Sequence, residues 1–220
     1  DSYTRSTLDN FLSLSRIKKQ PLKLVMGPWT HGWKTLALSY SGDVDFGPQA
    51  VIDYANLRLT FFDHWINGQS TAIMDEPPVN IFVMGGGDGK KNAQGRMNHG
   101  GCWRYEAEWP LARTQYEKYY LHTGGILSTL HPVADETPDS YQYDPRNPVP
   151  TIGGNISSLA GLLPQPVGSP YLPVKQREID IIGIPGAFDQ KEHPQFFGCT
   201  PPYLPLDSRH DILVYITDPF

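Results

Sequence analysis

Two segments carry apolar side chains at the three- and four-residue spacing of an amphipathic helix. The first predicts a short helix over residues 4–15. The second predicts a longer helix over Pro48–Asn67, because proline suits the first helical position and Gly68 stands where a C-terminal cap belongs. Its recurring apolar positions are Ala50, Tyr54, Leu57, Phe61 and Trp65. This is the clearest helical pattern in the chain.

Two apolar runs predict strands in the first half of the chain. Leu22–Met26 follows Pro21 and is typical of a strand that is buried on both faces of a parallel sheet. It ends at a Gly-Pro pair, after which a loop carries His31. Val79–Met84 predicts a second strand, which ends at three consecutive glycines. The loop at the exit of a parallel strand is where functional residues of α/β folds gather.

The pattern changes near residue 110. Beyond it no helical period returns, and short apolar runs alternate with turns rich in proline and glycine. We expect strands at Lys118–Leu121, Ser140–Tyr143, Ile179–Ile182 and Ile212–Thr217. Such alternation is typical of an antiparallel β-sandwich. The sequence therefore predicts two domains, residues 1–110 and residues 111–220.

The composition, with 39% hydrophobic and 19% charged residues, is that of a globular protein. A formal net charge of −5 without a basic run argues against nucleic acid or a membrane surface as a partner. Cys102 and Cys199 are too few for a disulfide framework, and their separation fits no zinc pattern. We expect no metal or other cofactor, and the composition leaves the compartment open. The first residues show no signal-peptide pattern, so we expect the chain to be part of a longer protein.

Asp1 and His31 are the strongest candidates for chemistry. Aspartate before histidine is the order of acid and base in the Ser, Asp, His triads of α/β-hydrolases. A histidine at a strand exit suits a general base, which must project from a rigid element toward the reacting atoms. The structural alternatives are a loop histidine bonded to the backbone and an aspartate that caps a helix. No serine stands in a Gly-x-Ser-x-Gly turn, so we nominate no nucleophile.

Three further motifs favour structural roles. Gly85–Gly89 follows a strand but lacks the lysine and the following helix of a phosphate-binding loop. Asp43 and Asp45 could ligate calcium, but the loop lacks the other spaced oxygen donors, which favours a role in ordering the loop. His64 lies beside Asp63 on the predicted longer helix, where we expect a solvated face. The remaining histidines show no metal-ligand spacing.

Eight motifs that follow one another along almost the whole chain match one family in the same order. They are Gly27–Gly32, Gly42–Pro48, Phe61–Trp65, Val79–Gly85, Trp109–Pro110, Tyr143–Gly154, Asp189–Gln190 and Asp211–Tyr215. Together they resemble the cocaine esterase-like hydrolases, a family related to the X-Pro dipeptidyl-peptidases. The resemblance implies the C-terminal portion of an α/β-hydrolase domain, followed by the N-terminal portion of an all-β jelly-roll-like sandwich.

The resemblance also implies the site. It places the catalytic histidine at His31 and the catalytic aspartate at Asp1, and Tyr3 resembles a position that lines the acyl pocket. We expect Trp29 to form part of the pocket wall. The neighbours expected from the second domain follow a Pro-x-x-Gly-Gly turn and are Gly154, Asn155 and Ile156.

These features predict a serine hydrolase that acts on a small-molecule ester or amide through an acyl-serine intermediate. The serine is expected upstream of Asp1, in the remainder of the same protein, so the 220-residue chain alone is expected to be inactive. The alternative is a non-catalytic jelly-roll module for binding or assembly, with a degenerate hydrolase portion. A further alternative, an X-Pro aminopeptidase, requires a site for a free amine that the sequence does not supply. Assembly into a homo-oligomer stays open.

Overall fold

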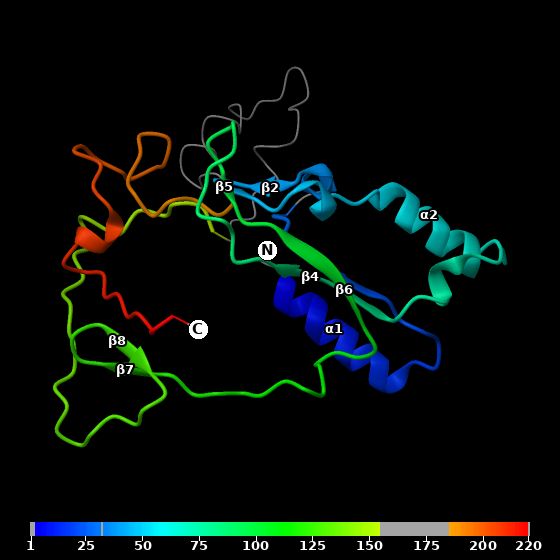
Figure 1. The fold of residues 1–220 in the computed structure, drawn as a ribbon, viewed down its shortest axis with the longest axis horizontal. Coiled ribbons are helices and arrows are strands. Elements are labelled where there is room, and N and C mark those ends of the chain that lie inside the picture. Colours follow the sequence, from blue (N-terminus) through cyan, green and yellow to red (C-terminus); the bar gives the residue numbers. More distant parts are fainter. Residues whose placement is uncertain (1–2, 32, 155–184, 220) are drawn as a thin grey trace. The chain divides into compact units, whose positions relative to one another are not determined.

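The computed structural model describes residues 3–31, 33–154 and 185–219 (Figure 1). The chain divides into two compact units. The first comprises Asp1–Ala112 with Gly153–Asp189, and the second comprises Arg113–Ile152 with Gln190–Phe220. Within the described residues the chain forms three small β-sheets and two α-helices. The assignment of residues 1–110 to a hydrolase domain and of 111–220 to a jelly roll stays a prediction.

The main sheet of the first unit has the strand order β1-β4-β6. Strand β1 (Leu24–Met26) pairs in parallel with β4 (Val79–Met84), from Leu24 opposite Val79 to Met26 opposite Ile81. Strand β6 (Gly101–Glu106) pairs with β4 in antiparallel fashion along its whole length. The predicted bounds of β4 are confirmed. Strand β1 pairs in parallel, as expected, but it begins at Leu24 rather than at Leu22. The expected burial on both faces is wrong, because Leu24 is buried whereas Val25 and Met26 are half-buried.

The side chain of Lys23, the residue before β1, contacts the segment that precedes β4. Its ammonium group donates to the carbonyl oxygens of Glu76 and Pro77, which come just before β4. Burial lowers the pKa of this amine, while the nearby carboxylates of Glu76 and Asp75 raise it. Lys23 therefore closes the beginning of the β1–β4 pair with its side chain rather than with ladder hydrogen bonds.

A buried cluster of the first unit lies against the main sheet. Phe46, Ala50 and Phe82 form a buried cluster, with Val44 and Trp103 packed against it. Phe46 and Phe82 meet edge to face, with ring centroids 6.1 Å apart, a favoured arrangement of aromatic pairs. This cluster joins the main sheet to the segment that precedes α2.

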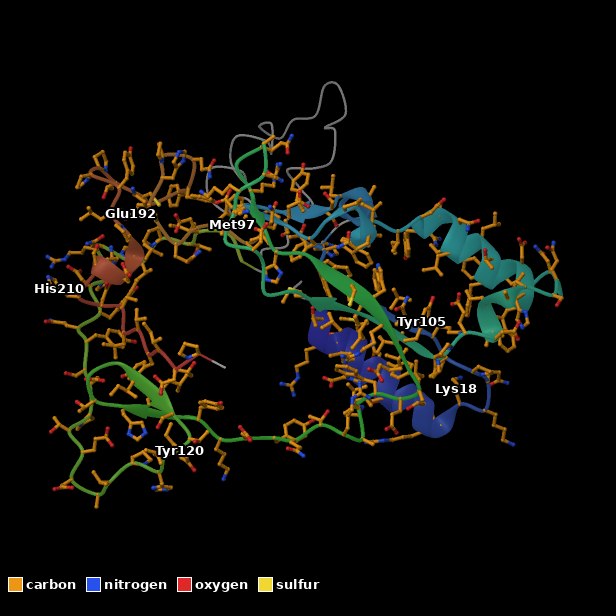
Figure 2. The ribbon with its side chains drawn as sticks, viewed as in Figure 1. Lys18, Met97, Tyr105, Tyr120, Glu192 and His210 are labelled. Atoms are coloured by element: carbon orange, nitrogen blue, oxygen red, sulfur yellow. The ribbon has the colours of Figure 1, made fainter. Side chains whose placement is uncertain are left out.

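A second small sheet has the order β2-β3-β5, with β2 (Tyr40–Ser41) and β3 (Val44–Asp45) forming a hairpin and β5 (Met97–Asn98) pairing with β3 (Figure 2). Gly42 has φ of +60° in the hairpin turn, and a Cβ there would overlap the carbonyl oxygen of Ala187.

The two aspartates of this hairpin order loops, as predicted. The Asp45 carboxylate accepts hydrogen bonds from the Gly47 amide (2.9 Å) and from Nδ2 of Asn92 (2.7 Å). The Asp43 carboxylate accepts from the Asp189 amide (3.2 Å). The described residues contain no group of three or more His, Cys, Asp or Glu side chains that could hold a metal ion.

Helix α1 (Thr4–Ile17) forms where predicted, but α2 (Tyr54–Trp65) begins six residues later than the predicted Pro48. Pro48–Ala50 is instead a 3-10 turn, η2, and the extended Val51 follows it. Asp53 caps α2, because its carboxylate accepts the amide of Asn56 (2.9 Å). Gly68 has φ of +64° just beyond the helix, as the predicted stop signal requires. No helix in the described residues is long and apolar enough to cross a bilayer.

The second unit contains a short hairpin of β7 (Tyr120–His122) and β8 (Ile126–Ser128). Of the predicted strands, Lys118–Leu121 is shifted to β7. The prediction of a strand at Ser140–Tyr143 is wrong, because these residues are exposed and have no strand beside them. Ile212–Thr217 contributes a single bridge, between Ile216 and Ile126. Ile179–Ile182 lies outside the described residues.

We predict that replacing Asp53 with alanine destabilises the chain by about 1 kcal/mol, because the first turn of α2 loses its cap. Urea unfolding followed by circular dichroism measures this change. Asp53→Asn is the matched control, since asparagine keeps an acceptor for the Asn56 amide and should stay within a few tenths of a kcal/mol of the parent. Equal stability of the alanine variant and the parent would show that the cap contributes nothing.

Candidate functional site

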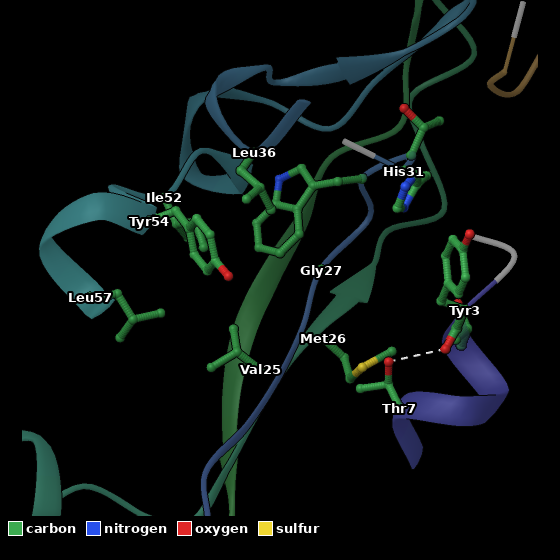
Figure 3. Close-up of a pocket in the computed structure, with 13 residues that line it drawn as sticks. Tyr3, Thr7, Val25, Met26, Gly27, His31, Leu36, Ile52, Tyr54 and Leu57 are labelled. Atoms are coloured by element: carbon green, nitrogen blue, oxygen red, sulfur yellow. Dashed lines mark hydrogen bonds between the residues drawn. The ribbon is translucent and has the colours of Figure 1, made fainter. Parts of the chain in front are cut away.

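A cavity of about 450 Å³ lies in the first unit, between the start of α1, β1, the His31 loop and the start of α2 (Figure 3). Apolar side chains form most of its wall, and none of its described lining residues is Asp, Glu, Lys or Arg. The lining residues are Tyr3, Thr4, Thr7, Val25, Met26, Gly27, Trp29, Thr30, His31, Leu36, Ile52, Tyr54 and Leu57.

Side chains on both sides of His31 hold its loop through hydrogen bonds to backbone carbonyl oxygens. The Trp29 indole lies against Gly27, where a Cβ would overlap the ring, and its Nε1 donates to the Ala50 carbonyl oxygen (2.9 Å). The Thr35 hydroxyl donates to the carbonyl oxygen of Thr30 (2.7 Å). Glycine at position 27 is thus required for the close approach of the indole, and His31 projects from a fixed turn at the exit of β1.

The rings of Tyr3 and His31 contact each other in the cavity wall. Their ring centroids are 4.6 Å apart and their planes are tilted by 46° (Figure 3). Tyr3 is the N-terminal cap residue of α1, and its carbonyl oxygen accepts the Thr7 hydroxyl (3.0 Å). The start of α1 therefore brings Tyr3 to the imidazole.

The structure brings together three of the predicted site residues, Tyr3, Trp29 and His31, in the lining of one cavity. Gly154 is not among the described lining residues. It pairs with Gly186 through two backbone hydrogen bonds, 2.7 Å and 3.2 Å long. Asp1, Asn155 and Ile156 lie outside the described residues.

His64 differs from its predicted position on a solvated face. Its side chain is half-buried, and its ring meets that of Trp65 with centroids 5.1 Å apart. The Nδ1 atom of His64 is buried, whereas Phe62 on the same helix is exposed.

The second unit contains a Ser, His, Glu set that the sequence reasoning missed. In the β7–β8 hairpin, Nδ1 of His122 lies 3.1 Å from both carboxylate oxygens of Glu136, and its Nε2 lies 3.1 Å from Oγ of Ser128. These residue types match a hydrolase triad, but their spacing matches no family signature. Hairpin pairing alone brings Ser128 opposite Tyr120 and so close to His122.

The hydrogen bonds of this set give it a structural role. Ser128 Oγ already accepts the Leu130 amide (3.2 Å), and His122 Nε2 lies equally close to the Leu130 carbonyl oxygen (3.1 Å). The Glu136 carboxylate also accepts the Thr123 amide (2.8 Å). The three side chains thus tie residues 130–136 to the hairpin. The hydrogen bonds from Thr123 and His122 hold the pKa of Glu136 below its usual range.

Comparison with known proteins identifies the family. The sequence pattern of the X-Pro dipeptidyl-peptidase C-terminal non-catalytic domain matches residues 71–220, which is more than half of the chain. The chain belongs to this family. The match includes β4, β6 and the whole second unit, whereas β1 and His31 precede it. The sequence resemblance to the cocaine esterase-like and X-Pro dipeptidyl-peptidase-like proteins is confirmed.

One relative extends the likeness upstream of residue 71. Cocaine esterase of Rhodococcus sp. (strain MB1 Bresler) is 29% identical to the chain over 167 residues. The alignment covers 71% of the chain but only 26% of that protein. The chain is therefore related to a hydrolase and spans about a quarter of its length.

We predict that the stabilising contribution of Glu136 is lost in acid. Its pKa is lower in the folded chain than its ordinary value of 4.5, so the ionised form stabilises the fold above that value and the contribution disappears as the pH falls below it. Thermal unfolding of the parent and of Glu136→Gln between pH 7 and pH 3 measures the difference. The gap in Tm should be largest at pH 7 and should narrow in acid. A gap that is independent of pH would contradict this role.

Proposed function

We propose that the chain is the histidine-bearing C-terminal part of a serine hydrolase that cleaves an ester or amide through an acyl-serine intermediate. The observation that carries the proposal is the placement of His31 at the exit of β1, beside Tyr3, in a cavity without charged side chains among its described lining. Relationship to a hydrolase supports it. The nucleophilic serine is assigned to sequence upstream of Asp1.

In this proposal His31 is the general base. It takes the proton from the serine hydroxyl as the serine oxygen bonds to the substrate carbonyl carbon, and it returns the proton to the leaving alcohol or amine. Water then attacks the acyl-serine with the same assistance. Asp1 orients the imidazole and stabilises its cation.

Tyr3 and Trp29 are proposed to contact the substrate, together with Gly154, Asn155 and Ile156 from the family-matched region. A charged substrate group would meet no opposite charge in the described wall, so the wall favours an uncharged acyl group. The described wall supplies no carboxylate for the free amine that an X-Pro aminopeptidase must bind.

The proposed fold is the C-terminal portion of an α/β-hydrolase domain followed by part of a jelly roll. The parallel β1–β4 pair, with the histidine loop at the end of β1, supports the first assignment. The family match over residues 71–220 supports the second. The remainder of the hydrolase is the proposed partner of the chain.

A non-catalytic binding or assembly module is the second candidate. The description of the matched family as non-catalytic favours it for residues 71–220. His31, Tyr3 and Trp29 lie before this region, so the description does not extend to them. Upstream sequence separates the two candidates, because a Gly-x-Ser-x-Gly turn before Asp1 is required for catalysis.

We predict that the gene product containing the sequence upstream of Asp1 reacts with a fluorophosphonate probe and hydrolyses a p-nitrophenyl ester. His31→Gln should lower kcat by about a millionfold, the typical cost of removing the base of such a triad. His64→Gln is the matched control and should retain activity within about twofold, because it lies outside the cavity lining.

The 220-residue chain alone should neither bind the probe nor turn over the ester. Probe labelling that is absent from the longer protein, or ester turnover that is unchanged in His31→Gln, would contradict the proposed function and favour the non-catalytic module.

A further inference from the structure

Two tryptophans from distant parts of the chain donate hydrogen bonds to one short segment. Nε1 of Trp103 donates to the Gln49 carbonyl oxygen (2.7 Å), and Nε1 of Trp29 donates to the next carbonyl, that of Ala50 (2.9 Å). The two indoles also contact each other, with ring centroids 5.5 Å apart. Trp29 belongs to the histidine loop, whereas Trp103 lies on β6, within the region whose family is described as non-catalytic.

This segment, residues 49–52, forms hydrogen bonds with residues before and after His31 in the sequence. On the N-terminal side it holds Trp29 through Ala50. On the C-terminal side the Ile52 amide donates to the Leu36 carbonyl oxygen (3.1 Å). Any shift of this segment therefore moves the two ends of the loop that carries the imidazole.

The segment itself is fixed on β6. Nε2 of Gln49 donates to the carbonyl oxygens of Gly101 (3.0 Å) and Phe46 (2.8 Å). Ala50 is fully buried in the aromatic cluster, and Phe82 packs edge to face on Trp103 with centroids 5.4 Å apart. Ala50 is fully buried, and its carbonyl would be costly to leave without the Trp29 donor. The bond from Trp103 to the exposed Gln49 adds a second point of attachment, so the two indole hydrogen bonds together define one position for the segment.

We propose that Trp103 is a positioning residue for His31 and that β6 thereby gives the family-matched region a part in catalysis. This inference rests on the proposed role of His31 as general base. Trp103 touches no reacting atom. It acts through segment 49–52 and Trp29, which together set where the imidazole stands.

The first experiment measures esterase kinetics in the longer protein that contains the upstream sequence. Trp103→Phe keeps an aromatic ring but removes the N–H donor, and it should lower kcat about 10-fold. Trp103→Leu removes ring and donor and should lower kcat about 100-fold, the scale expected when a catalytic group is displaced by about 1 Å. KM should change less than about threefold, because Trp103 does not line the cavity.

Trp65→Phe is the matched control. Trp65 is 40% exposed at the end of α2 and lies outside the cavity lining, so its replacement should leave kcat within about twofold. Wild-type kcat in both Trp103 variants would overturn the inference. The inference would also be overturned if Trp65→Phe and Trp103→Phe lowered kcat by the same amount for the same loss of Tm, because the effect would then follow stability alone.

A double-mutant cycle tests whether the two indoles act through one segment. If each acted alone, the loss of kcat in Trp29→Phe with Trp103→Phe would be the product of the single losses. We expect the double variant to lose markedly less than that product, because either change already frees segment 49–52. A multiplicative loss would contradict the shared segment.

A measurement on the 220-residue chain separates this inference from the proposed function. The imidazole signal of His31, assigned by its loss in His31→Gln among the seven histidines, should shift and broaden in Trp103→Phe and stay unchanged in Trp65→Phe. If this coupling is present while the longer protein has no esterase activity, the proposed function fails and the positioning by Trp103 stands. If the longer protein is active and the signal is unchanged in Trp103→Phe, the inference fails.

Discussion

The parallel pairing of β1 with β4 is the interaction on which the rest of the first unit depends. Strand β1 has only three residues, and a strand of that length has no stability of its own. Its register on β4, which begins with the Leu24 amide on the Pro78 carbonyl oxygen, fixes the point at which the histidine loop leaves the sheet. Since β4 is also paired along its full length with β6, β1 rests on an antiparallel strand pair supplied by the family-matched region.

This arrangement makes residue 71 a poor place to divide the chain. The family pattern begins there, yet the main sheet contains β1 from before it and β4 and β6 from after it. The aromatic cluster also combines residues from both sides of residue 71, because Phe46 and Ala50 pack with Phe82 and Trp103. A region described as non-catalytic therefore forms the support of the loop that carries the candidate base. Burial of this shared apolar surface holds the two sequence segments together.

The sequence predicted the elements that depend on local patterns. The bounds of β4 followed from its apolar run, and the end of α2 followed from Gly68. The start of α2 could not be predicted from periodicity, because the Asp53 cap and the two indole hydrogen bonds favour a 3-10 turn at Pro48–Ala50 over another turn of helix. The candidate site shows the same division. His31 stands out locally by its strand exit, whereas Trp103 and Gln49 act through hydrogen bonds to backbone atoms more than fifty residues away, which leave no local signal.

Native-state hydrogen exchange of the 220-residue chain tests the central claim, that β1 and the antiparallel β4–β6 pair form one cooperative unit. The measurement compares the Leu24 amide, which donates to Pro78, with the amides of β4 as denaturant is increased. The account predicts that their opening free energies converge on a single value, as expected when one cooperative unit contains both strands. A Leu24 amide that opens at a much lower free energy, while the β4 amides stay protected, would show that β1 is a separate unit and would contradict this account.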